Sequence, residues 1–285
     1  MAAKTLGTYT FLPILALMAG VSAVPAQPPA GAPLLSPEQA QALVRHALSN
    51  ELHAAANRGQ LLRFTLLKSS PRLTTVKKII ETREGDVARL ISVNDEPLNT
   101  AAEQKEQARL TGLLNDPAQQ ASRKQREDKD RNRAVEVLRA LPSAFLFQYA
   151  GPGESSAGPV ERFTFKPNPA FNPSSMELRV LTAMAGQLWI DPFAERAVHL
   201  EGLLQHGVAF GWGILGHLNR GGWITIDQAN VADNQWRTVR LQLKMSGRVL
   251  FISKTYDTLE EQSHYQLVPE NLSYREAIKM LRVDP

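Results

Sequence analysis

The chain has 285 residues and no cysteine, which excludes disulfides and metal sites built on thiolates. Its formal net charge of +4 is small for this length and spread along the chain, so nucleic acid is not expected as a partner. Beyond an N-terminal segment considered next, roughly 250 residues remain, which is enough for one large β-rich domain with an ordinary hydrophobic core.

The first residues have the features of a secretory signal peptide. Lys4 supplies a positive charge, and the apolar run "TFLPILALMAGV" is too short to span a bilayer comfortably. Small residues follow in "VSAVPAQ", so cleavage is expected after Ala23 or Ala26. The alternative is an uncleaved N-terminal anchor, against which Pro13 and the short apolar run argue.

These features divide the chain into three parts. We predict a signal peptide over residues 1–26, a Pro/Ala-rich linker over 27–35 and a single domain over 36–285. Export to the periplasm follows from the signal peptide. Because no cysteine is present to carry an acyl chain, a lipid anchor is not expected.

The domain is expected to begin with an amphipathic helix. Ser36 and Gln39 form a capping box, Pro37 suits the first helical position, and Gly59 suits the end. One apolar stripe at helical spacing must face other apolar surface; it consists of Ala40, Leu43, Val44, Ala47, Leu48, Leu52 and Ala55.

An antiparallel meander is expected after this helix. The strand patterns "QLLRFTLLKS", "RLTTVKKIIETR" and "DVARLISVN" follow one another, with a turn at Glu84–Asp86, and connections this short cannot join parallel neighbours. A helical insertion at about 100–141 then interrupts the strands. Its two helices are expected to be capped by Thr100 with Glu103 and by Asp116 with Pro117.

The second of these helices is crowded with both signs of charge from Arg123 to Arg133. We interpret this segment as a solvated helical face. The alternative is a binding site for a polyanion or for a partner such as an envelope protein.

Strand patterns resume after Pro142 and continue to "EEQSHYQLV". "GPGESSAGP" is expected to be a flexible loop, "ELRVLTAMAGQLWID" a strand, and Asp191–Pro192, Asp233–Asn234 and Ser246–Gly247 turns. The predicted fold class is mainly β with helices (α+β). Its curled antiparallel sheet, an incomplete β-barrel, is lidded by the N-terminal helix and the helical insertion.

The segment "FGWGILGHLNRGG" contains a G-x-G-x-x-G pattern at Gly211, Gly213 and Gly216. A dinucleotide site requires a helix directly after the glycines, whereas here Gly221 and Gly222 lead into another strand pattern. We therefore expect Phe210–Ile214 to be a strand with one bare face and no nucleotide to bind.

No catalytic, cofactor or metal site is predicted. None of the six histidines pairs with another at metal-ligand spacing, and "GESSAG" lacks the spacing of a nucleophile elbow. Aromatic residues are abundant in the C-terminal strands, and an incomplete barrel of this size leaves room for an apolar ligand. The candidate ligand-lining residues are Leu43, Ala47, Leu48, Phe145, Phe147, Phe163, Phe165, Trp189, Phe210, Trp212 and Trp223.

The first helix is expected to form one wall of the ligand site. Its stripe consists largely of alanines, which fill little volume, so gaps should remain beside the aromatic residues of the sheet. On this hypothesis a tryptophan at Ala47 fills the gap and reduces ligand uptake.

Three segments carry a resemblance to a known family. "GQLWIDPFAERAVHLEG" looks like a recurring hairpin in which a strand with W-I-D-P turns into a strand ending in L-E-G, and "AFGWGILG" and "RVLFISKTY" are similar to exported relatives. Together with the order of elements over residues 36–268, they resemble the periplasmic lipoprotein-carrier and sorting (LolA/LolB-like) superfamily.

The resemblance implies a curled, incomplete barrel lidded by helices, with a cavity that holds acyl chains. Its partners would be a lipid or an acylated lipoprotein, and its role would be non-enzymatic. The helical insertion is longer than in a minimal carrier, and no ligand-gating residue of the family can be matched here.

Two other classes remain open. One is an envelope protein-interaction or stress-sensing module on the same scaffold, which would show a filled barrel and an exposed patch on the helical insertion. The other is a hydrolase, which would show a cleft with a Ser–His pair or paired carboxylates.

Overall fold

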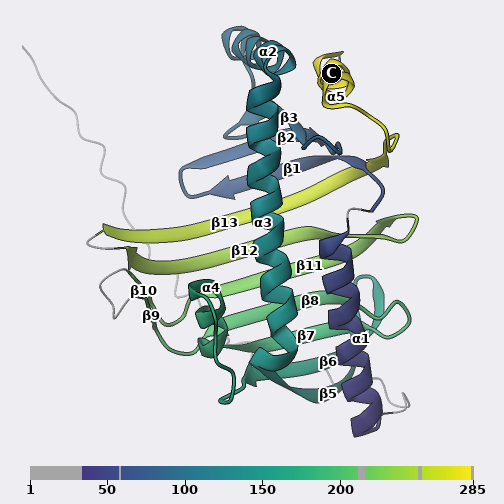
Figure 1. Cartoon of the computed structure of the whole chain (residues 1–285), viewed down its shortest axis with the longest axis vertical. Helices are drawn as coiled ribbons and strands as arrows, with labels where there is room; N and C mark the ends of the chain where they lie inside the picture. The colour runs from purple at the N-terminus through teal and green to yellow at the C-terminus, as the bar shows by residue number, and fades with distance from the viewer. Residues whose placement is uncertain (1–33, 58, 211–215, 250–251, 284–285) are drawn as a thin grey trace, which may run out of the picture.

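The computed structural model describes residues 34–57, 59–210, 216–249 and 252–283, so both expected cleavage sites and most of the linker lie outside the described residues (Figure 1). A single sheet of thirteen strands forms the framework. The strands are β1 (Leu62–Ser70), β2 (Leu73–Ile80), β3 (Val87–Val93), β4 (Glu96–Pro97), β5 (Phe145–Ser155), β6 (Gly158–Pro167), β7 (Met184–Asp191), β8 (Arg196–Leu204), β9 (Val208–Phe210), β10 (Gly216–Leu218), β11 (Trp223–Ala232), β12 (Gln235–Val249) and β13 (Ile252–Leu267).

Every strand pairing in the sheet is antiparallel. The order is β4-β3-β2-β1-β13-β12-β11-β8-β7-β6-β5, with β9 and β10 paired beside β12. Because β4 and β5 end this order without pairing to each other, the sheet is not a closed barrel. The predicted fold class, an α+β fold with an open antiparallel sheet and helices, is confirmed.

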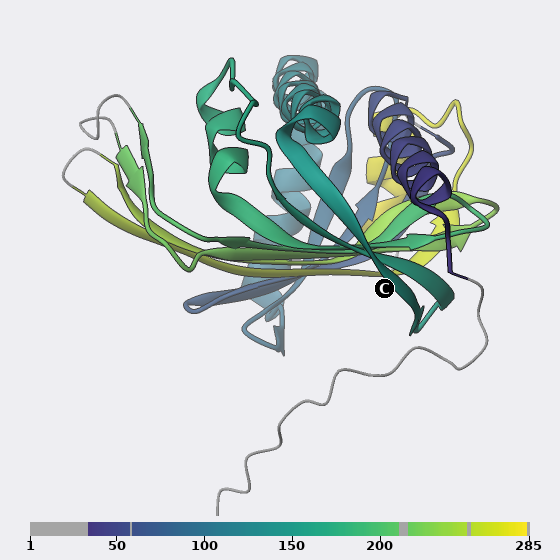
Figure 2. The same ribbon diagram turned by 90° about the horizontal axis from the view of Figure 1, so that it is seen from below.

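The helices are α1 (Pro37–Ala56), α2 (Thr100–Asn115), α3 (Pro117–Ala144), α4 (Met176–Arg179), the short 3-10 helix η1 (Val180–Ala183) and α5 (Tyr274–Val283). Figure 2 shows that α1, α3 and α4 lie on one side of the sheet, within its hollow. None of the helices in the described parts of the chain is long and apolar enough to cross a membrane.

The predicted helix ends are largely as the capping signals indicate. Ser36 and Gln39 form the expected capping box of α1, and Asp116 caps α3 through the backbone N–H of Gln119. The cap of α2 was misplaced by one residue, because the Asn99 side chain, rather than Thr100, accepts from the backbone of Ala102. Pro142 does not end α3, which continues for two further residues.

Three predictions in the C-terminal half are wrong, namely one strand, one loop and one turn. The first part of "ELRVLTAMAGQLWID" is helical, as α4 and η1, and "GPGESSAGP" is the paired end of the β5–β6 hairpin rather than a loop. Ser246 and Gly247 lie inside β12. Gly247 is required for close approach and not for a turn, because a Cβ there would lie 2.2 Å from the backbone oxygen of His217 on β10.

The glycine-rich segment lies between two antiparallel partners. β9 ends at Phe210 and β10 begins at Gly216, and the two strands pair with each other. Residues 211–215, which include two of the three glycines, lie outside the described residues. Because a strand and not a helix follows, the described surroundings lack the strand-turn-helix context of a dinucleotide fingerprint.

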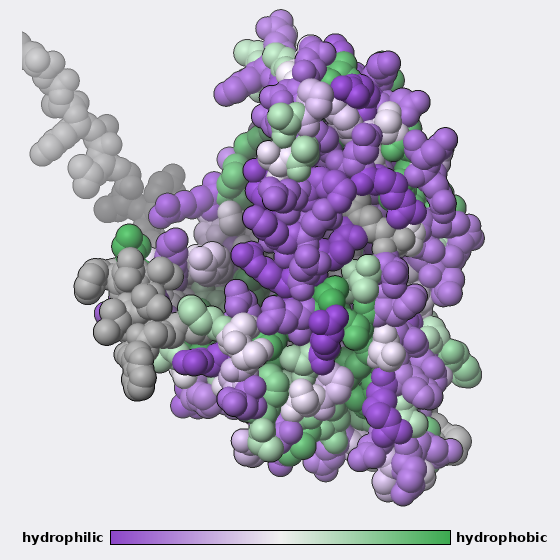
Figure 3. All heavy atoms as spheres, in the orientation of Figure 1, coloured by the Kyte–Doolittle hydropathy of each residue, from purple (hydrophilic) through white to green (hydrophobic). Residues whose placement is uncertain are grey.

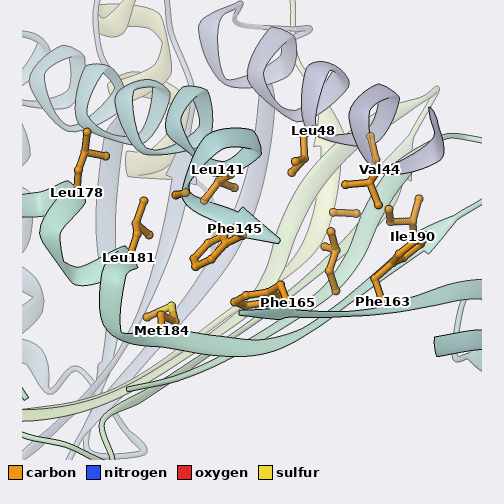
Figure 4. Close-up of a cluster of buried hydrophobic side chains, with 14 of the residues drawn as sticks. Val44, Leu48, Leu141, Phe145, Phe163, Phe165, Leu178, Leu181, Met184 and Ile190 are labelled. Atoms are coloured by element: carbon orange, nitrogen blue, oxygen red, sulfur yellow. The ribbon is translucent and has the colours of Figure 1, made fainter. Parts of the chain in front are cut away.

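Among the described residues, two large hydrophobic cores and one small cluster of Val160, Val198 and Trp236 stabilise the fold. The aromatic core lies between α1, the end of α3 and strands β5–β8; in Figure 4, Val44 and Leu48 of α1 lie opposite Phe163, Phe165 and Ile190 of the strands. The α5 core lies at the other end of the sheet and joins α2, α5 and the first strands through Leu61, Ile80, Val87, Leu110, Leu113, Val268, Leu272, Tyr274, Ala277, Ile278 and Leu281.

Candidate ligand cavity between the helices and the sheet

A cavity of about 640 Å³ lies between α1, α3 and the hollow face of the sheet. In Figure 3, hydrophobic side chains are visible in the strip between the strongly hydrophilic surfaces of α3 and α1. The cavity is lined by Leu48, Glu51, Ala54 and Ala55 of α1, by Arg131, Arg133, Ala134, Val137, Leu138 and Leu141 of α3, and by sheet residues that include Leu188, Arg196, Ala197, Leu200, Ile226, Gln228, Trp236 and Arg237.

The helix α3 bridges this space because its two halves differ. Its C-terminal half packs against α1, α4 and β5 through residues such as Leu138 and Leu141. Its N-terminal half is held by polar contacts to the β2–β3 turn, where Gln120 donates to the backbone oxygens of Glu84 and Gly85 at 3.0 and 2.9 Å. The middle of the helix therefore crosses the hollow supported at both ends.

The charged segment of α3 also has structural uses within the chain. The guanidinium of Arg123 donates to the backbone oxygen of Asp86, and Glu127 accepts from the backbone N–H of the same residue. Lys124 and Asp128 form an ion pair along the helix. These contacts fit the interpretation of the segment as a solvated face that also holds the turn.

One wall of the cavity carries a buried ion pair. The Glu51 carboxylate of α1 accepts hydrogen bonds from Nε and Nη2 of the Arg196 guanidinium on β8, at 2.7 and 3.0 Å. It also accepts from the backbone N–H of Ala197 at 3.1 Å and from Gln228 at 3.0 Å. This network ties α1 to β8 and β11, and such bidentate, fully bonded pairs are the geometrically specific ones.

Arg196 is further fixed by an aromatic ring. Its guanidinium carbon lies 5.4 Å from the ring centre of Trp236, within cation–π range. Nearby, Arg237 donates to the backbone oxygen of Gln60 and lies 3.7 Å from the Glu81 carboxylate. The cavity thus has an apolar part under α3 and a polar part near these arginines.

Against the aromatic core, Tyr149 of β5 makes a short hydrogen bond to a carboxylate. Its hydroxyl donates to Glu161 at 2.5 Å. Burial, together with this hydrogen bond to a carboxylate, raises the pKa of Tyr149 to about 12. The phenol therefore serves as a hydrogen-bond donor at neutral pH.

Of the candidate ligand-lining residues, Leu48 lines the cavity directly. Five others are buried in the aromatic core next to the cavity: Leu43, Ala47, Phe145, Phe163 and Phe165. Phe147 is half-buried against the same core. Ala47 has 0 % of its surface exposed, so a tryptophan there would overpack the core. Ala55, two turns further along α1, is one of the alanines that line the cavity.

The two described tryptophans of the candidate set point to the other face of the sheet. Trp189 lies between Leu188 and Ile190, which are both in the aromatic core, and successive strand side chains alternate between faces. Trp223 precedes Ile224, which packs against the same core. The side chain of Phe210 and the whole of Trp212 lie outside the described residues.

Several lining residues were not anticipated from the sequence. Val137, Leu138 and Leu141 come from the end of a helix interpreted only by its charge, and Ile226 and Trp236 were not assigned to a face. A signal for Glu51 was present, because it is a charged residue three positions after Leu48 within the apolar stripe of α1. A charge inside an apolar stripe indicates a buried partner.

Two histidines of the sheet lie close to polar side chains, and one of them, His199, also lines the cavity. Ser263 Oγ lies 2.9 Å from His264 Nδ1, but the two are exposed neighbours on β13. His199 Nδ1 lies 2.6 Å from the Asp227 carboxylate, with the Trp189 ring beside the imidazole. Within residues 34–57, 59–210, 216–249 and 252–283, no group of three or more metal-ligating side chains is gathered.

Comparison with known proteins gives distant structural matches. No family model and no curated protein sequence matches the chain. A putative outer membrane lipoprotein-sorting protein domain from Vibrio parahaemolyticus is similar with a TM-score of 0.31 and 9% identity, covering 83% of this chain and 97% of that one. MucB, solved in complex with MucA(peri), is similar with a TM-score of 0.21 and 10% identity, covering 76% and 93%. Both likenesses are distant, and neither assigns a function to this chain.

Proposed function

We propose that this chain is an exported, non-enzymatic carrier that binds an acyl chain of a lipid or lipoprotein in the cavity between α1, α3 and the sheet. The observation that carries the proposal is the cavity itself. It joins an apolar interior to a wall of fixed charges.

The volume and lining fit such a ligand. About 640 Å³ lies within the size range of small-molecule sites. Apolar side chains from α1, α3 and the sheet, such as Leu48, Val137 and Ile226, would surround the chain, and each buried methylene contributes roughly 0.8 kcal/mol. The charged wall near Arg196 and Arg237 offers partners for a polar head group.

The space stays open for a physical reason. On α1 the lining positions beyond Glu51 are alanines, which let the helix approach the sheet without filling the volume between them. On α3 the lining changes from Val137, Leu138 and Leu141 to Arg131 and Arg133, whose charged heads favour water over the apolar floor.

A plug variant tests the proposal. Ala55→Trp should fill part of the cavity and weaken binding of a fluorescent fatty acid or lipopeptide by about tenfold or more, since several methylene contacts are lost. Ala56→Trp is the matched control, because Ala56 is an exposed neighbour on the same helix that does not line the cavity.

The outcomes separate the candidate functions. If the wild-type protein binds neither probe, or if Ala55→Trp binds both as well as Ala56→Trp does, the carrier function is refuted and a partner-binding module becomes the better account. Export is tested independently: N-terminal sequencing of the mature protein should begin at Val24 or Gln27.

A further inference from the structure

The two ends of the sheet are protected to different degrees. At one end, β4 has only two residues, and both discourage pairing with a further strand. Glu96 is charged, and Pro97 has no backbone N–H to donate. At the other end, β5 has eleven residues and pairs with β6 on one side only. Open edges of this length invite another strand.

The protection of β5 is confined to its second half. A bulge interrupts the pairing between Tyr149 and Gly151, where Gly151 has a φ of +96°, and Pro152 follows. The first half, Phe145 to Tyr149, reads "FLFQY" and contains no charge, proline or glycine. Leu146, at 45 % exposure, is a large apolar side chain in this unprotected stretch.

The hydrogen-bond pattern shows which backbone groups face the open edge. The backbone N–H of Asn168 donates to the oxygen of Ala144 at 2.8 Å, which makes that pair a hydrogen-bonded one. Because the pattern alternates, Leu146 and Gln148 bond to β6, whereas Phe145, Phe147 and Tyr149 direct their backbone groups outward. Phe145 uses its own N–H to cap α3 at Leu141.

No other described residue bonds to the outward backbone groups of Phe147 and Tyr149. The segment entering α1 does reach Tyr149, but it contacts the side-chain hydroxyl. The edge therefore offers regularly spaced donors and acceptors beside an uncharged surface, which is a template for one more strand.

We propose that this edge pairs with the same segment of a second copy of the chain, antiparallel about a two-fold axis through Phe147. An antiparallel pair centred on an outward-facing residue lets that residue exchange both backbone groups with its own copy. With the two-fold axis at Phe147, every residue of β5 before the bulge takes part in the pairing. It places Phe145 opposite Tyr149, and Leu146 opposite Gln148, so no charge meets another charge.

Charge substitutions at the exposed positions test this pairing without disturbing the core. Leu146→Lys with Gln148→Lys places like charges opposite each other in both halves of the interface, which disfavours cross-strand pairing. The dimer dissociation constant of the full mature chain, measured by sedimentation, should rise about tenfold or more. The double glutamate variant should behave in the same way.

Complementary charges should restore the assembly. A mixture of the double lysine and double glutamate variants should form a heterodimer, and Leu146→Lys with Gln148→Glu in one chain should dimerise at least as well as wild type. Leu73→Lys is the matched control, since Leu73 is an equally exposed leucine at 48 % on another strand and should leave dimerisation unchanged.

A wild-type chain that stays monomeric throughout the concentration range overturns the proposal. So does a double lysine variant that dimerises like wild type, or lysine and glutamate variants that do not combine. Neither Leu146 nor Gln148 lines the cavity, so all variants should bind the lipid probe equally well. If no dimer forms, the proposed carrier function is unaffected.

Discussion

The two ends of α3 are held by different chemistry: the aromatic core packs against its C-terminal end, and hydrogen bonds near the α5 core hold its N-terminal end. In the aromatic core, the rings of Phe145 and Phe165 lie 4.6 Å apart, and Leu141 joins them from α3. In the α5 core, the apolar residues are aliphatic apart from Tyr274, and buried polar side chains such as Glu106 and Gln120 make the links to neighbouring backbone.

This difference explains why a cavity persists between the two cores. Dense aromatic packing fixes one end of α3 close to the sheet, while hydrogen bonds to the β2–β3 turn fix the other end. A helix fixed at both ends does not collapse onto the strands beneath its middle. If the two ends are independent, a substitution at one end should leave the other unchanged.

Phe163→Ala should lower the free energy of unfolding by about 3–5 kcal/mol, because it leaves a large void in the aromatic core, where Phe163 is almost fully buried. Denaturant titration measures the loss. Hydrogen exchange should rise in β5–β8 more than in β1–β3; equal increases everywhere would show that the two cores form one cooperative unit.

Glu51→Ala should cost about 3 kcal/mol, since Arg196 would remain buried beside the cavity without its carboxylate. Hydrogen exchange in α1 should rise as the helix loosens. His46→Ala is the matched control: His46 lies on the same helix, and its Nδ1 contacts the Glu195 carboxylate at 3.0 Å, but both side chains are exposed, so the loss should cost less than about 1 kcal/mol. Equal effects would refute the special role of the buried pair.

Glu106→Gln should cost about 1–3 kcal/mol at neutral pH and should flatten the pH dependence of stability. Burial alone would raise the pKa of Glu106, but hydrogen bonds from Arg109 and the Leu90 backbone lower the pKa below its ordinary value of 4.5. A lowered folded-state pKa stabilises the protein above pH 4.5, and that stability is lost as the pH falls through the folded value. A variant with the same acid sensitivity as wild type would contradict this account.

Lys124→Ala should change stability by no more than about 0.5 kcal/mol, because its ion pair with Asp128 is exposed and lies along one helix. Thermal unfolding in low and high salt measures it. A loss above about 1 kcal/mol would mean that the charged segment of α3 is more than a solvated face.

Local signals predicted the elements whose stability is local. The capping box at Ser36 fixes α1, and the short turns fix the β1–β3 meander. The helix α5 was missed although its signals are of the same kind. Ser273 and Glu276 form a capping box, and Tyr274, Ala277, Ile278 and Leu281 follow at helical spacing.

The cavity depends on information that the chain does not carry locally. Whether an aromatic side chain faces the helices depends on strand register. The aromatic character of Trp189 and Trp223 therefore could not reveal which face of the sheet they occupy. The Glu51–Arg196 pair joins residues 145 positions apart, and Glu51 could be recognised as unusual but its partner could not. The helix α3 was interpreted from its charged residues alone, so the apolar residues at its C-terminal end were not recognised as lining a cavity.

The order of strands has a consequence for how the chain is made. The first strand pairs with the last, so that Leu62 lies opposite Leu267, and β13 is the sole link between β1–β4 and the rest of the sheet among the described strands. The N-terminal meander therefore cannot join the sheet until nearly the whole chain has been synthesised. Pairings of such long sequence separation form slowly, and until then β1 and β12 each expose an unpaired edge to other unfinished chains. A ribosome-bound or unfolded intermediate would be most prone to aggregation at those two strands.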